Sequence, residues 1–203
     1  MSNARNLARL IVDSGGDVDV SSLGNVPPSN DASALTTGTL GTARLPAGSV
    51  IQAKQITSNS IVSTTNSSWT DTGISWSFDN ALRSGSKVLV TLNVNMGQMY
   101  AGSWANLAYV TIFESGTNRG DANHGIAGSA ANLGGSAQTG QVVYDVERMG
   151  GSCLFTPAST TPTISLYFRT ADPNTGIKIN SSWNDGSAGY RSSLTGFIME
   201  IAA

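Results

Sequence analysis

The sequence predicts an all-β protein: an antiparallel β-sandwich or jelly-roll head, preceded by a thin extended stem and a short N-terminal helix. From residue 50 to the C-terminus, runs of alternating apolar and polar residues are separated by turn-forming Gly, Asn, Asp and Pro. Before residue 50, large apolar residues recur at a spacing of five, which fits neither a helix nor a strand. We therefore expect three parts, at residues 1–33, 34–49 and 50–203.

The composition limits the classes of partner. Only 12% of the 203 residues are charged and the net charge is −2, whereas ordinary domains carry about 25% charged residues. Ser, Thr, Asn and Gly must therefore cover much of the surface, which suits a long-lived extracellular assembly. With 11 Lys and Arg and no basic cluster, the chain is not expected to bind nucleic acid. It shows neither a signal-peptide core nor a membrane-length apolar run, so we expect synthesis in a cytosol and no membrane insertion.

Residues 1–33 contain one candidate helix, at residues 2–12. Ser2 can cap it, and Leu7 and Ile11 lie on one apolar stripe together with small alanines. An isolated helix of two to three turns is marginal in water, so this stripe is expected to dock on a partner. Leu7 and Ile11 are therefore the predicted anchor residues. The Ser-, Asn- and Pro-rich chain that follows favours extended backbone.

The predicted stem carries four large apolar residues, Leu35, Leu40, Leu45 and Val50, separated by Thr, Gly and Ala. Fixing five residues costs roughly 5–10 kcal/mol of backbone entropy, while burying one Leu returns only about 1.5–3 kcal/mol. A single copy gains little by ordering this segment. Several copies running side by side could bury the four residues in a shared core; the alternative is a flexible Thr/Gly linker.

The head is predicted to contain roughly eight to ten short strands and no helix, which favours a sandwich or jelly roll. Ile74, Trp76 and Phe78 alternate with polar residues, and residues 88–96 form the clearest strand. Residues 107–113 are apolar on both faces, as expected for a central, doubly covered strand. Further strands are expected at residues 60–65, 141–147, 153–156, 163–170, 176–181 and 196–202, with a long Gly-rich loop at residues 115–140.

Several segments resemble the C-terminal domains of bacteriophage tail fibres, especially those of cyanophages and other marine phages. They are the junction at residues 35–50, SWTDTGI at 68–74, SKVLV at 86–90, and the ending from 179–180 to IMEIAA at 198–203. The resemblance implies a homotrimer made in the bacterial host cytoplasm and carried on the virion, with an intertwined stem, a head that meets the host and an N-terminal segment held by other virion proteins. Similar heads occur on capsid-surface fibres, so the resemblance leaves tail and capsid locations open.

No constellation of residues predicts an enzyme, a metal site or a cofactor. His124 is the sole histidine and lies in a Gly-rich loop without a nucleophile motif. The carboxylate pairs Asp71 with Asp79 and Asp145 with Glu147 could in principle cleave glycosides, but turn and surface roles explain such pairs better. Cys153 is the only cysteine, so neither a disulfide nor a thiolate zinc site can form within one chain, and we expect a small buried apolar residue there.

Binding is the function class that the sequence favours. Aromatic faces beside amide and hydroxyl groups suit sugar rings. The candidate residues in or beside predicted loops are Tyr100, Trp104, His124, Trp183, Tyr190 and Arg191. The alternative is that these side chains pack between subunits or cap the core. We therefore expect a fibre or spike whose head binds a host-surface glycan or other receptor; the alternative is a capsid decoration, cement or head-fibre protein with no receptor role.

Overall fold

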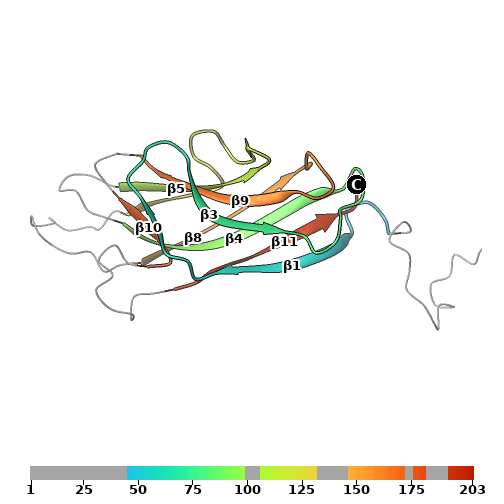
Figure 1. Ribbon diagram of the computed structural model, residues 1–203, viewed down its shortest axis with the longest axis horizontal. Helices are drawn as coiled ribbons and strands as arrows, with labels where there is room; N and C mark the ends of the chain where they lie inside the picture. Colours follow the sequence, from blue (N-terminus) through green and yellow to red (C-terminus); the bar gives the residue numbers. More distant parts are fainter. Residues whose placement is uncertain (1–44, 99–105, 132–145, 172–175, 182–191) are drawn as a thin grey trace, which may run out of the picture. The chain divides into compact units, whose positions relative to one another are not determined.

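Two antiparallel β-sheets pack face to face and enclose one hydrophobic core (Figure 1). The computed structural model describes residues 45–98, 106–131, 146–171, 176–181 and 192–203, among which there is no helix. The chain divides into Met1–Gly41 and Thr42–Ala203, and the sandwich belongs to the second unit. The prediction of an all-β sandwich is confirmed. The predicted N-terminal helix with Leu7 and Ile11, and the stem residues Leu35 and Leu40, lie outside the described residues.

Sheet A is built around β4. Its strands are β1 (Val50–Ser58), β2 (Val62–Thr64), β4 (Lys87–Gln98), β8 (Val146–Phe155), β10 (Ile177–Ile179) and β11 (Leu194–Ile201). β8 pairs with β4 on one side, while β11 and β10 pair with successive parts of β4 on the other. β1 and β2 then pair with β11 and β10 at the outer edge. Sheet A is therefore four strands wide.

Sheet B is built around β9 and β5. Its strands are β3 (Thr70–Ser77), β5 (Asn106–Glu114), β6 (Thr117–Asn118), β7 (Ala127–Ala131) and β9 (Thr163–Thr170). β3 pairs with β9 and β9 with β5, while β6 and β7 pair with successive parts of β5. This sheet is also four strands wide. Figure 1 shows β3, β9 and β5 in one layer and β4, β11 and β1 in the other.

The alternation predicted for the clearest strand is confirmed. Val88, Val90, Leu92, Val94 and Met96 of β4 are all buried. They face the inner residues of sheet B, of which Phe168 is the largest fully buried side chain. The half-buried Cys153 packs against this core, where burial raises the pKa of its thiol to about 11. The thiol therefore stays protonated and unreactive at neutral pH.

Three strand predictions need correction. β1 was not predicted, because two of its inward positions carry polar side chains instead of apolar ones. Gln52 donates a hydrogen bond to Glu200, and Lys54 donates to Ser77 O and Asp79. Two strands were expected, at residues 141–147 and 153–156, but residues 146–155 form the single strand β8. Its central glycines interrupt the alternation of apolar and polar residues. The loop expected at residues 115–140 contains β6 and β7.

Two carboxylates are buried, Glu114 at the end of β5 and Glu200 on β11. Glu114 accepts hydrogen bonds from Arg119, the Ser115 hydroxyl and the Ala158 N–H. Glu200 accepts from the Arg83 N–H, the Ser86 hydroxyl and Gln52, each at 2.7 Å. Burial by itself raises the pKa of each group, but these hydrogen bonds outweigh it and hold both pKa values below the ordinary 4.5. Both acids are therefore stable as carboxylates at neutral pH.

This arrangement predicts an acid-sensitive fold. Because the unfolded chain binds protons to these groups at higher pH than the folded chain does, their stabilising effect is complete above the ordinary pKa and is lost as pH falls through the lowered values. The free energy of unfolding in urea should therefore decrease as pH falls below about 4.5. In Glu114→Gln and Glu200→Gln this decrease should be smaller, since each variant lacks one titrating group. Equal pH slopes in the wild type and both variants would contradict the assignment.

The segment that leads into β1 and the C-terminal residues meet at one end of the sandwich. Gly48 N donates to Ala202 O and Ala202 N donates to Ser49 O, both at 2.8 Å, just before β1 begins at Val50. At the opposite end β4 finishes, with Gly97 paired to Val146 and Gln98 to Ile177. Asn106, where β5 begins, pairs with Ala131, where β7 ends. The sandwich therefore has one end where the chain enters β1 and the C-terminus lies, and another bounded by several strand ends.

Candidate functional site

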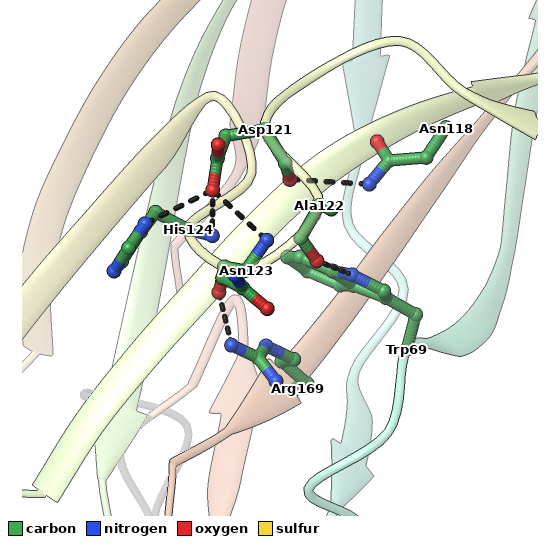
Figure 2. A network of polar contacts seen from close by, with 7 residues as sticks. All are labelled: Trp69, Asn118, Asp121, Ala122, Asn123, His124 and Arg169. Atoms are coloured by element: carbon green, nitrogen blue, oxygen red, sulfur yellow. Dashed lines mark hydrogen bonds and ion pairs between the residues drawn. The ribbon is translucent and has the colours of Figure 1, made fainter.

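The best-defined surface feature is the 119–126 loop between β6 and β7 (Figure 2), whose tip contacts Tyr109 and Arg169 on the outer face of sheet B. Asp121 and Gly125 exchange both backbone hydrogen bonds, at 2.9 and 3.0 Å. Asp121 Oδ1 accepts from the N–H of Asn123 at 2.9 Å and of His124 at 2.7 Å, and it lies 2.9 Å from His124 Nδ1. The carboxylate of Asp121 thus fixes the backbone of the loop tip and orients the imidazole.

Side chains from other strands tie this loop to the sheet. The Trp69 indole N–H donates to Ala122 O at 2.8 Å, and Arg169 on β9 donates to Asn123 O and to Ser67 O. Asn118 accepts from Gly120 N–H and from the Thr111 hydroxyl, and it donates to Asp121 O (Figure 2). Contacts from β5, β6, β9 and the chain before β3 therefore hold the loop in one arrangement.

Aromatic rings surround the anchored loop. The Arg169 guanidinium carbon lies 5.1 Å from the ring centroids of both Trp69 and Tyr109, and Tyr109 meets His124 edge to face at 5.7 Å. Tyr109 and Arg169 are directly paired across β5 and β9. Farther along the same face, Phe113 stacks on Tyr167 at 3.9 Å. We call Trp69, Tyr109, Asp121, His124 and Arg169 the loop cluster.

The loop cluster combines charge with exposed polar atoms. Of its side chains, His124 is 72% exposed and Asp121 is 58% exposed. Backbone hydrogen bonds, first from His124 and then from Asn123, hold the pKa of Asp121 below its ordinary 3.8. The carboxylate is therefore ionised at neutral pH. The cluster presents an anionic acceptor, an imidazole and partly exposed rings at a fixed spacing. Such groups can bind a ligand that has both polar and apolar parts.

Of the two carboxylate pairs considered above, Asp71 and Asp79 have separate partners, and Asp145 lies outside the described residues. Asp71 accepts from Gly73 N–H at 2.9 Å, while Asp79 pairs with Lys54 at 2.6 Å. Within the described ranges, no group of three His, Cys, Asp or Glu could hold a metal ion. The same residues include no helix long and apolar enough to cross a membrane.

Of the six predicted binding residues, only His124 lies within the described residues, and it is exposed on a loop as expected. The others lie outside them: Tyr100, Trp104, Trp183, Tyr190 and Arg191. Sequence reasoning missed Trp69, Tyr109 and Arg169, which the fold places beside His124. The outward position of Tyr109 could have been predicted, because Ala108 and Val110 on either side of it are buried. It was missed because residues 107–113 were expected to be covered on both faces. The 119–126 loop does cover the outer side of this strand at the fully buried Thr111.

No protein-family model matches the sequence, and no curated protein is significantly similar to it. The resemblance to phage fibres therefore stays a prediction. The function has to be argued from the loop cluster, the fold and the composition.

Proposed function

We propose that this chain is a structural virion protein: a homotrimeric tail fibre or spike whose head binds a carbohydrate on the host cell surface without cleaving it. In this proposal residues 1–33 attach the protein to other virion proteins through the helix that carries Leu7 and Ile11. Residues 34–49 form a three-stranded stem, and residues 50–203 form the head. The sparse charge and the local resemblance to phage fibres support this organisation.

The strand order supports a jelly-roll description of the head. Taking β1 with β2, β6 with β7, and β10 with β11 as single strands, the chain changes sheet at every connection except the one from β5 to β6. Two four-stranded sheets linked in this way are typical of the jelly rolls that occur in viral capsid and lectin domains. This likeness is one of architecture, so the function still depends on the site.

The observation that carries the binding proposal is the loop cluster. A sugar ring presents C–H groups that pack on aromatic rings and hydroxyls that need fixed hydrogen-bonding partners. Tyr109 and His124 supply rings at an interplanar angle of 72°, and Asp121 beside them supplies an acceptor. Because the loop is already held by Trp69 and Arg169, binding would cost little further ordering.

Weak sites are sufficient in such an assembly. A monovalent dissociation constant near 1 mM corresponds to only about −4 kcal/mol, but several linked sites can raise avidity by about 10²–10⁴. Three heads on a stem and several stems on a particle would supply that multivalency. A weak site on a polar and aromatic surface is therefore sufficient in a multivalent fibre, although it would not be sufficient on an isolated monomer.

The test is a binding titration of the full chain against purified host-surface polysaccharide. His124→Ala and Tyr109→Ala should each weaken binding by about tenfold, as expected for residues at the centre of a site. Ser75→Ala, an exposed position on the outer side of β3, is the matched control and should bind normally. Both cluster variants should keep the wild-type melting temperature to within a few degrees.

Two outcomes would count against this site. If His124→Ala and Tyr109→Ala bind normally while Trp104→Ala, Tyr190→Ala or Arg191→Ala do not, the glycan binds at the loops predicted from sequence. If all five variants bind normally, the loop cluster and those loops are both excluded, and a capsid decoration role without receptor binding takes their place.

A further inference from the structure

One band on the outer face of sheet A, at the end where β1 begins and β11 ends, is apolar across the full width of the sheet. The register aligns four residues in one row, with Leu89 paired to Leu154 on one side and to Met199 on the other, and Met199 paired to Ala53. Phe197 lies on the same side of β11, and Ile201 and Val50 pair at the end of the face nearest the C-terminus. We call these residues the apolar face: Val50, Ala53, Leu89, Leu154, Phe197, Met199 and Ile201.

Much of this apolar surface is open to solvent. Val50 is 52% exposed, Leu154 is 55% exposed and Phe197 is 47% exposed, and they are three of the four exposed large hydrophobic residues in the described part of the chain. Lys87 is the outward cross-strand partner of Ile201 and places one charge at the border of the apolar face. From Leu89 to Asn95 the outward positions of β4 carry no charged side chain, and Thr91, Ser152 and Gln55 border the apolar residues. A contiguous exposed apolar band of this kind marks an interaction site.

We infer that this face is where copies of the chain meet in the homotrimer, an inference that rests on the trimer of the proposed function. The reason is continuity with the segment that leads into β1. Val50 is the last of the apolar residues spaced by five, and it belongs to the apolar face. Residues 48 and 49 are hydrogen-bonded to Ala202, which directly follows β11. A stem assembled on a three-fold axis would therefore deliver its last apolar residue directly onto this face.

The same geometry keeps the loop cluster accessible. The loop cluster lies on the outer face of sheet B, and the apolar face lies on the outer face of sheet A, so the two surfaces point in opposite directions. If the three apolar faces turn toward the axis, the three loop clusters turn away from it. The outward charged residues of sheet A, Lys87, Arg148 and Lys178, lie at or beyond the border of the apolar face, whereas the charged groups of the loop cluster lie on the sheet B side.

The experiment measures the molar mass of the full chain in solution by light scattering. Wild type should be a trimer, and the double variant Leu154→Glu/Phe197→Glu should be a monomer, since each copy would bring two charges to the contact. The double variant Ser75→Glu/Ser77→Glu places the same charges on exposed outward positions of β3 and should remain a trimer. A circular dichroism melt would show that the sheet A variant is folded.

Each outcome is decisive. A trimeric wild type with an equally trimeric Leu154→Glu/Phe197→Glu variant would overturn this face as the contact, leave the trimer standing, and point to the chain's own N-terminal segment or another virion protein as its cover. A monomeric wild type would overturn the trimer and this inference together. If the double variant does not fold, maleimide labelling of Phe197→Cys in the full chain replaces it. Labelling at least about tenfold slower than that of Ser75→Cys supports the contact, and equal rates overturn it.

Discussion

Replacing Gly125 with Val is expected to displace the 119–126 loop and to abolish measurable polysaccharide binding. Gly125 has a φ of +68°, and a Cβ at this position would lie 2.2 Å from Val110 O and 2.8 Å from the Trp69 ring. A β-branched residue is strained at such a φ by about 1–3 kcal/mol, and neither the β5 backbone nor the anchored indole can give way easily. The loop must therefore move, which separates His124 from Tyr109.

Gly116 provides a matched control for this substitution. It has a φ of +79°, in the tight turn between β5 and β6, but a Cβ there would meet nothing within 4 Å. Gly116→Val should therefore lose stability through backbone strain alone and keep its binding. Urea unfolding and polysaccharide titration of both variants separate the two effects. Normal binding by Gly125→Val, at any stability, would show that the arrangement of the loop is irrelevant to function.

Removing residues 1–33 is expected to eliminate incorporation of the protein into virions while leaving a soluble, folded trimer. A short amphipathic helix followed by Pro-containing chain has no core of its own, so we expect a partner surface to order it. The sandwich should be unaffected, because the core consists of residues between Ile56 and Ile198. Quantifying the protein in purified particles by mass spectrometry measures incorporation.

The variant Leu7→Asp/Ile11→Asp is the point-mutation counterpart of that deletion. It keeps the length of the N-terminal segment but places two charges on the predicted apolar stripe, so it should also fail to incorporate. Full incorporation of either variant would exclude residues 1–33 as the virion anchor.

β4 could be predicted in full because its inner residues are all apolar: their alternation gave both its position and its buried face. The position of β9 was also predicted, at residues 163–170. β1 could not be found in this way, because Gln52 and Lys54 occupy inward positions at the edge of the sandwich, where polar partners satisfy them. β6 and β7 are short or consist largely of small residues, so no apolar period identifies them.

The loop cluster was less predictable because strand pairing creates it. Trp69 and Ala122 are 53 positions apart, and Arg169 and Asn123 are 46 apart, yet both pairs are hydrogen-bonded. No local pattern shows which outward residues of β5 and β9 face each other, since that depends on register. His124 was found because its neighbourhood of Asp, Asn and Gly predicts a loop, which is a local property.

If the protein is the virion fibre proposed above, the most direct test of host attachment is whether it competes with those virions for adsorption. Purified full-length protein, added to host cells before the virions, should block adsorption in a dose-dependent way and leave the chain length of the surface polysaccharide unchanged. The Gly125→Val variant should not block adsorption at the same concentrations. Undiminished adsorption in the presence of saturating wild-type protein would contradict receptor binding, and shortened polysaccharide would contradict binding without cleavage.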